Sequence, residues 1–272
     1  SVLDDTNDTK KGTKWDYATQ WSFHPSESIS LILPYFYGLQ NFSVKDRSNP
    51  EKFMKQASYW GYMPFTQSTH YLGLLIIIIS FFSLWHCIIK KDFGRTELYL
   101  WIIVIAVLVT GFGSHFSILY KPLFKLAPFF SKFRVPSMIY MMLSLLLPML
   151  AAIGLDKITI KHDKNTLFND SVKIFGTFIA FSLIFLLFGE SLLSFSSSGD
   201  VRFPNYVEIV QNIRIDLFNK GVILALLISS GALFSIWLYS EDKISKQILS
   251  IILIGILIVD LWVINNEFLS LK

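Results

Sequence analysis

The stretch Leu74-Leu-Ile-Ile-Ile-Ile79 decides the fold of this chain, because it offers no polar side chain on any face. It lies within a longer apolar run from Tyr71 to Ile89. A surface helix of a soluble protein shows polar residues every three or four positions, and this run does not. A helix needs about 20 mostly apolar residues to cross a hydrocarbon core about 30 Å thick. The run therefore predicts a membrane-spanning helix rather than a helix buried in a large soluble bundle.

Five further stretches are long and apolar enough to cross a membrane, and no predicted span contains lysine or arginine. The spans are expected at residues 71–89, 98–117, 136–155, 174–195, 221–239 and 248–264. Acidic residues occur only in the fourth, as Glu190, and in the sixth, as Asp260. The pattern predicts an all-α integral membrane protein with about six transmembrane helices.

The composition agrees with a membrane protein and excludes several other classes. Of 272 residues, 53% are hydrophobic, 25 are phenylalanine, and the mean hydropathy is +0.50. The net charge of +4 comes from short basic clusters between apolar runs, which argues against nucleic acid as a partner. A lone Cys87 cannot build a disulfide or a cysteine metal site within the chain. Because the polar start at Ser1 does not resemble a signal peptide, we interpret the chain as an internal fragment, with the rest of the polypeptide missing on both sides.

Basic residues in the short loops predict the orientation, since cytoplasmic loops carry an excess of lysine and arginine. The loops after the first, third and fifth spans contain Lys90, Lys91, Arg95, Lys157, Lys161, Lys164, Lys173, Lys243 and Lys246. On the opposite side, basic residues are spread over longer segments, at Lys121, Lys125, Lys132, Arg134, Arg202, Arg214 and Lys220. We therefore expect residues 1–70 to form an extracytoplasmic loop and residues 71–272 to form the transmembrane domain.

Three external segments are expected to lie at or in the membrane surface. Residues 28–42 are apolar but too short to span, and Pro34 and Gly38 break them, which predicts a re-entrant or interfacial helix. Residues 114–133 mix aromatic rings, prolines and lysines, a pattern typical of the headgroup layer. Residues 207–218 show a helical apolar repeat and predict a short amphipathic helix before the fifth span.

Polar residues beside the predicted spans gather toward the outer side. Glu190 and Asp260 are near the outer ends of their spans, His115 ends the second span, and His70 precedes the first. An ionised group in hydrocarbon costs several kcal/mol, so such residues usually face a partner or a water-filled cavity. The pattern predicts an outward-facing polar cavity, with the alternative that Glu190 and Asp260 simply reach the headgroup layer.

Arg134 is the candidate for binding a lipid phosphate. It stands in Phe133-Arg-Val-Pro-Ser137, where the proline begins a helix, and an arginine before a helix N-terminus can hold phosphate by a bidentate contact. The alternative is a general headgroup anchor. Trp21, Tyr59 and Trp60 provide aromatic faces that suit sugar rings and membrane interfaces equally well. The candidate substrate-binding residues are Trp21, Tyr59, Trp60, His70, His115 and Asp260.

Common catalytic motifs are absent from the chain. It contains no Walker A lysine motif, no Gly-x-Gly-x-x-Gly, no His-Glu-x-x-His and no Gly-x-Ser-x-Gly. An ATPase, a zincin and a serine hydrolase are therefore unsupported, and no metal-ligating residues are predicted.

Several short motifs, in order and spacing, resemble the central part of YfhO-type bacterial membrane proteins. The match covers most of the chain. The motifs are Tyr17-Ala-Thr-Gln-Trp-Ser22 followed by Glu27 and Leu31-Ile-Leu-Pro34, Tyr59-Trp-Gly61, Pro64-Phe-Thr66, Tyr71-Leu-Gly73, Phe133-Arg-Val-Pro-Ser137, Arg214-Ile-Asp216 and Asp260-Leu-Trp262. His24 and Pro25 depart from the glycine-containing turn expected there, which concerns local geometry only.

The resemblance implies a GT-C type bundle in the bacterial inner membrane. Such a glycosyltransferase takes sugar from a polyprenyl-phosphate donor on the outer face and transfers it to a cell-envelope acceptor. A carboxylate acts as general base while cations, or a divalent metal, stabilise the leaving phosphate. The family's main carboxylate is expected upstream of Ser1, and within this chain the candidates are Asp16, Glu27 and Glu190. Membrane lipids and the lipid-linked sugar are the implied partners; the alternative is a lipid or polymer transporter, or a non-catalytic membrane scaffold.

Overall fold

The computed structural model describes residues 14–38, 41–45, 53–63, 70–89, 91, 94–128, 130–132, 134–160, 164–202, 204 and 207–269. The regular elements in this part of the chain are helices, apart from one pair of strands. In chain order the elements are α1 (Trp15–Ala18), η1 (Pro25–Leu31), β1 (Asn41–Lys45), β2 (Phe53–Ala57), α2 (Leu74–Ile89), α3 (Arg95–Gly111), η2 (Gly113–Phe116), α4 (Ser117–Leu126), η3 (Phe130–Lys132), η4 (Pro136–Met142), α5 (Leu143–Thr159), α6 (Lys164–Leu192), η5 (Ser198–Arg202), α7 (Val207–Ser240) and α8 (Lys246–Leu269), where η marks a 3₁₀-helix.

Each predicted span corresponds to a helix of the structure. Four helical stretches in the described residues are long and apolar enough to cross a membrane: Pro136–Thr159, Lys164–Leu192, Val207–Ser240 and Lys246–Asn266. The pair Arg95–Gly111 and Gly113–Leu126 would be a fifth, but it bends by 111°. Helix α2 is apolar and has 16 residues, which is short for a span. The chain is thus a multi-pass membrane protein, and the number of six spans stays a prediction.

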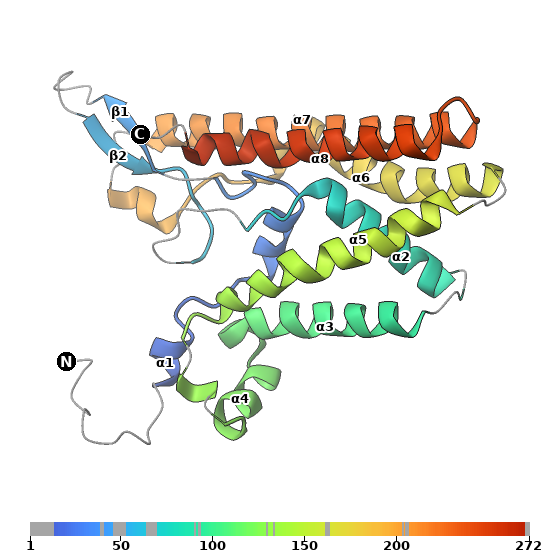
Figure 1. The fold of residues 1–272 in the computed structure, drawn as a ribbon. Coiled ribbons are helices and arrows are strands. Elements are labelled where there is room, and N and C mark those ends of the chain that lie inside the picture. Colours follow the sequence, from blue (N-terminus) through green and yellow to red (C-terminus); the bar gives the residue numbers. More distant parts are fainter. Residues whose placement is uncertain are drawn as a thin grey trace.

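The helices form two groups that α2 joins (Figure 1). Helix α5 packs against α2 and α3, while α7 packs against α6 and α8, and α2 contacts members of both groups. The C-terminal ends of α2, α5 and α7 and the N-terminal ends of α3, α6 and α8 lie at one end of the bundle, and α1, α4 and the β hairpin lie toward the other (Figure 1). This arrangement agrees with alternating crossings in which the basic short loops share one side.

The segment after η1 is inserted between the two groups of helices. Leu33, Tyr35 and Phe36 belong to the apolar core around α2, α6 and α7, while Phe23 and Leu31 belong to the core around α3 and α5. The helix expected within residues 28–42 is therefore shorter than predicted and begins earlier, as η1, and turns follow it. Its packing between helices is what a re-entrant segment requires.

Two glycines show how closely the elements pack. A Cβ atom on Gly154 of α5 would lie 2.1 Å from the carbonyl oxygen of Ile79 on α2, so only glycine allows these helices to approach this far. Gly113, between α3 and η2, has φ +51, and a Cβ there would lie 2.2 Å from Oγ of Ser22. This glycine stands at the sharp bend between α3 and α4, which ends the second apolar run earlier than predicted.

Two further features differ from the sequence prediction. Strands β1 and β2 pair antiparallel, with Asn41 opposite Ala57 and Lys45 opposite Phe53, and this hairpin was not predicted alongside the all-α helices. The amphipathic helix expected at residues 207–218 is present, but it continues without a break into the fifth predicted span as α7. Only Asn219 and Lys220 separate the two predicted parts, and Gly221, which begins the predicted span, does not end the helix.

Candidate functional site

Glu27 is a buried carboxylate on η1, with only 2% of the residue exposed. The short helix begins at Pro25, whose fixed φ suits the first helical position. The ring of His24 caps it, since the backbone N–H of Ser26 donates to His24 Nδ1 at 3.3 Å. These local features place Glu27 one turn into the helix and toward the loop that follows β2.

The loop after β2 closes around this carboxylate. The hydroxyl of Tyr59 donates to Glu27 Oε2 at 2.8 Å, and the backbone N–H of Tyr62 donates to Glu27 Oε1 at 2.6 Å. The backbone N–H of Met63 in turn donates to the Tyr59 hydroxyl at 3.0 Å. Each carboxylate oxygen has a second lone pair, so Glu27 can still accept a hydrogen bond from a substrate hydroxyl.

The surroundings of Glu27 favour its protonated form. Burial raises the pKa of Glu27, and the hydrogen bonds from Tyr62 and Tyr59, together with the charge of His24, offset part of that rise. Burial and the nearby Glu27 carboxylate likewise raise the pKa of Tyr59. Glu27 thus binds a proton more tightly than an ordinary glutamate, which is a property of many general acids and bases.

Aromatic rings and histidines surround the carboxylate. The ring of His24 stacks on Tyr62 with centroids 4.0 Å apart, and His115 meets His24 edge-on at 4.8 Å. The hydroxyl of Tyr37 donates to Ser26 Oγ at 3.1 Å. The group that we call the Glu27 cluster is His24, Glu27, Tyr37, Tyr59, Tyr62 and His115.

His70 and Trp60 lie beside this cluster, but in more apolar surroundings. His70 packs edge-on against Phe23, with centroids 5.0 Å apart, and burial lowers the pKa of its imidazole. Trp60 packs against Tyr37 and Phe195 at 4.7 and 5.4 Å. Its buried Nε1–H has no hydrogen-bond acceptor among the described residues. Adjacent residues thus have different roles, because Tyr59 binds Glu27 while Trp60 packs in an aromatic core.

Arg134 is exposed and lies against α1. Its guanidinium hydrogen-bonds to the hydroxyl of Tyr17 and lies 5.3 Å from the centroid of that ring. Val135, at φ +66, turns the chain into the helix that Pro136 begins, and the backbone N–H of Ser137 donates to the carbonyl of Trp21 at 3.5 Å. One bond to Tyr17 uses only one of the five guanidinium N–H donors, so others remain for an anion.

The other two candidate carboxylates are exposed. Asp16 is on α1, and Glu190 is near the end of α6, where it accepts a hydrogen bond from Nδ2 of Asn219 at 3.1 Å. No hydrogen bond within the described residues joins either one to the Glu27 cluster. Their catalytic role stays a prediction, and the structure gives Glu27 the most distinctive environment of the three.

Asp260 is fully buried and caps a helix. Its carboxylate accepts hydrogen bonds from the hydroxyl of Tyr71 and, at 3.2 Å, from the backbone N–H of Leu75. The Tyr71 hydroxyl accepts a bond from the N–H of Leu74 at 2.7 Å. Asp260 on α8 therefore satisfies N–H groups of the first turn of α2, which no helical carbonyl can reach. The predicted contact of Asp260 with substrate is untested. In this position the residue stabilises the start of α2.

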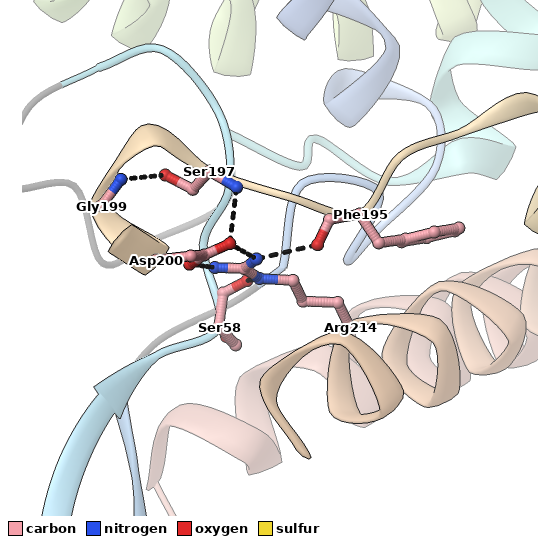
Figure 2. Close-up of polar contacts among 6 residues, drawn as sticks. All are labelled: Ser58, Phe195, Ser197, Gly199, Asp200 and Arg214. Atoms are coloured by element: carbon pink, nitrogen blue, oxygen red, sulfur yellow. Dashed lines mark hydrogen bonds and ion pairs between the residues drawn. The ribbon is translucent and has the colours of Figure 1, made fainter. Parts of the chain in front are cut away.

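A second polar centre, at Arg214 of α7, was not among the predicted site residues (Figure 2). The side chain is 1% exposed, and its Nη1 and Nη2 donate to the two carboxylate oxygens of Asp200 at 2.7 and 2.9 Å. Nη1 also donates to the carbonyl of Phe195, and Nε donates to the carbonyl of Ser58 at 3.1 Å. Arg214 thus joins α7, the segment before η5 and the residue that precedes Tyr59.

The charge of Asp200 is stabilised in this centre. Burial acts to raise the pKa of Asp200, but the hydrogen bond from Arg214, the N–H of Ser197 and the positive charge of Arg214 together bring it below the usual value. The sequence signals were the Ser-rich turn ending at Asp200 and the Arg214-Ile-Asp216 motif, and neither indicated that the two side chains would meet.

An apolar cavity of about 170 Å³ lies next to the Glu27 cluster. Its wall on one side is η1 and the following residue, with Ser28, Leu31 and Ile32, and on the other sides it is α2, α3 and α5. The buried hydroxyl of Ser28 has no hydrogen-bond partner in the part of the chain that the structure describes. The cavity can accept a segment of hydrocarbon chain close to Glu27.

The described residues contain no group of three or more His, Cys, Asp or Glu side chains that could hold a metal ion. Comparisons of the chain with protein-family models, curated proteins and solved structures gave no match.

Proposed function

We propose that this chain is a glycosyltransferase module of the bacterial inner membrane, with a GT-C type bundle. In this proposal it transfers sugar from a polyprenyl-phosphate donor to a cell-envelope acceptor on the outer face. The observation that carries the proposal is the Glu27 cluster, a buried carboxylate with a raised pKa among aromatic rings, histidines and an apolar cavity. Perturbed carboxylates in such surroundings are candidates for acid–base catalysis.

Glu27 is the general base of the proposed reaction. Its carboxylate takes the proton of the acceptor hydroxyl as that oxygen attacks the anomeric carbon of the donor sugar, and the bond from that carbon to the phosphate oxygen breaks. The hydrogen bonds from Tyr59 and the N–H of Tyr62 hold the carboxylate in place. The exposed ring of Tyr62, stacked on the half-buried ring of His24, offers an aromatic face for a sugar.

Arg134 and the cavity beside η1 serve the donor. The exposed guanidinium of Arg134 stabilises the polyprenyl phosphate that leaves, as cations do at transferring phosphoryl groups. The cavity lined by Leu31, Ile32 and the helices accepts the first isoprene units of the donor. Both features adjoin the segment from α1 to η1.

Sugar transfer in membranes that contain the full-length protein tests the assignment. With a radiolabelled polyprenyl-phosphate hexose as the probe, we expect Glu27→Gln to lower the rate by at least about 100-fold, because general-base catalysis contributes that much. We expect Arg134→Ala to lower it by about 100-fold or more, as removal of a charge-stabilising donor does. Glu208→Gln is the matched control, since Glu208 is exposed at the start of α7 and is not a candidate site residue; full activity of Glu27→Gln would remove Glu27 from the mechanism.

One observation favours transport as the second candidate function. His86 on α2 and Asp170 on α6 are both buried in the half of the bundle away from the Glu27 cluster, with 3.9 Å between Nε2 and Oδ2. Buried ionisable pairs in membrane proteins often mark an ion or substrate path. Transport predicts that Asp170→Asn abolishes uptake or export of the substrate, whereas the glycosyltransferase proposal predicts that sugar transfer by this variant persists.

A further inference from the structure

A cavity of about 400 Å³ opens between α2 and α6, away from the Glu27 cluster. Phe81, Trp85 and Ile88 of α2 form one wall, and Ile174 and Phe178 of α6 form the other. A volume in this range is typical of sites for small molecules. The C-terminal end of α2 and the N-terminal end of α6 lie at the same end of the bundle as the turn between α7 and α8 (Figure 1).

Among the residues that line this cavity, Trp85 and Lys173 carry hydrogen-bond donors of interest. The indole Nε1–H of Trp85 is buried and has no acceptor among the described residues. A buried donor without an acceptor is unfavourable, so a turn of the Trp85 ring that brings this N–H to an acceptor on a ligand would be favoured. The ammonium group of Lys173 is the second donor, whereas the hydroxyl of Thr177 is already used by the carbonyl of Lys173 at 2.5 Å.

Lys173 lies at the edge of the cavity, and its side chain is largely exposed. Its side chain is 58% exposed, and Nζ lies 5.4 Å from the centroid of the Trp85 ring. Within the described residues its one acidic contact is Oδ1 of Asp170 at 3.9 Å, beyond hydrogen-bonding distance. Because the ammonium has three donors, it can bind an anion without breaking a hydrogen bond.

The position matches the level of lipid headgroups. Lys173 directly precedes the predicted fourth span, and α2 ends at Ile89, four residues after Trp85. Tryptophan and lysine are typical of the boundary between hydrocarbon and headgroups. The cavity walls lie on the hydrocarbon side of this boundary, while the cation lies on the aqueous side.

We propose that this cavity binds an anionic diacyl phospholipid of the surrounding membrane. One acyl chain lies between Phe81 and Phe178, and the phosphate meets the ammonium of Lys173 and the N–H of Trp85. The negative charge of the headgroup complements Lys173 and the neighbouring basic loops. A zwitterionic headgroup, which has no net charge, complements them less well. The site is at the far end of α2 from the Glu27 cluster and does not depend on the proposed transferase activity.

Quenching of tryptophan fluorescence by lipids with brominated acyl chains tests this site. The full chain is placed in nanodiscs of phosphatidylcholine that contain increasing fractions of brominated phosphatidylglycerol or brominated phosphatidylcholine. The signal of Trp85 is the difference between the native chain and Trp85→Phe. We expect half-maximal quenching of Trp85 at an about fivefold lower fraction of the anionic lipid, the effect of one lysine near a charged surface.

Matched variants separate the site from general lipid contact. Lys173→Met should remove the fivefold preference, and Lys173→Arg should keep it. Lys243→Met is the control, because Lys243 also lies over a tryptophan, 4.2 Å from the Trp237 centroid, and does not line this cavity. Equal quenching by the two lipids, an equal loss with Lys243→Met, or displacement by polyprenyl phosphate at equal mole fraction would overturn the proposal.

Discussion

At the scale of single residues, the chemistry of this protein depends on which carboxylates are buried and what holds them. Glu27, Asp200 and Asp260 each accept hydrogen bonds from residues far away in the sequence. The sequence identified Glu27 as a candidate catalytic residue and Asp260 as a polar residue near the end of a span. It did not identify the residues that form hydrogen bonds with them. Tyr71 and Asp260 are 189 positions apart, and no local pattern encodes such a contact. Burial of Glu27 and the Arg214 centre were therefore beyond sequence reasoning.

The raised pKa of Glu27 predicts a shift in the pH profile of activity. The general base must be ionised, so the rate should rise with pH through a pKa above the ordinary value of 4.5. Tyr59→Phe removes a hydrogen bond that lowers the pKa of Glu27, so the acid limb should move to still higher pH. The pH dependence of sugar transfer measures this, with Tyr99→Phe, an exposed tyrosine on α3, as the control. An unmoved acid limb would contradict the role of Glu27.

The same pKa has a consequence for stability, with the opposite dependence on pH. A carboxyl group whose pKa is raised by folding stabilises the folded state fully below the unfolded value of about 4.5, and this contribution is lost as pH rises through the raised pKa. The stability of the Glu27→Gln variant should therefore change less with pH over this range than that of the native chain. Thermal unfolding in detergent at several pH values measures the effect, and an unchanged curve would show that Glu27 is not perturbed.

Arg214 is expected to be a major contributor to stability. Arg214→Ala leaves Asp200 and two carbonyl groups without their donor, which should cost about 3 kcal/mol, the lower end for buried ion pairs because Asp200 remains 15% exposed. Arg95→Ala, on an exposed arginine of α3, should cost less than about 0.5 kcal/mol. Denaturation in detergent compares the two variants. If both cost the same, the bidentate contact in Figure 2 contributes nothing to stability.

At the scale of elements, the helices were predictable and the connections between them were not. Long apolar runs determine α5, α6, α7 and α8, because lipid is the only solvent that satisfies them. The bend of 111° after Gly111 and the hairpin of β1 and β2 depend on contacts rather than on composition. Gly113, for example, adopts a positive φ close to the side chain of Ser22, and the neighbouring sequence contains no signal for this conformation.

Close packing of α2 and α5 is testable at one glycine. Gly154→Val places atoms against the carbonyl of Ile79, so we expect a loss of about 1–3 kcal/mol or more from overpacking. Gly255→Val on α8 is the control, because a Cβ there would meet nothing within 4 Å. Thermal unfolding in detergent compares them. Equal stability of the two variants would mean that the helices do not approach as the structure has them.

At the scale of the whole molecule, the arrangement divides the chain into two polar ends and an apolar middle. Helices α1 and α4 and the β hairpin lie toward one end, where Arg134 contacts α1, and the helix ends that flank the short basic loops lie toward the other (Figure 1). The excess of lysine and arginine in those loops predicted this division from the sequence alone. The sequence also predicted six crossings, but α2 and the bent pair of α3 and α4 fall short of an uninterrupted long span.

The central claim is that the Glu27 cluster faces outward on a protein that crosses the membrane six times. Single cysteines at four exposed positions, Gln20, Lys91, Ser198 and Glu241, test it in intact cells with a membrane-impermeant maleimide, since the native Cys87 is buried. The account predicts labelling of Gln20→Cys and Ser198→Cys from outside, and of Lys91→Cys and Glu241→Cys only after permeabilisation. Labelling of Lys91→Cys together with Gln20→Cys from outside, or protection of Gln20→Cys in intact cells, would contradict it.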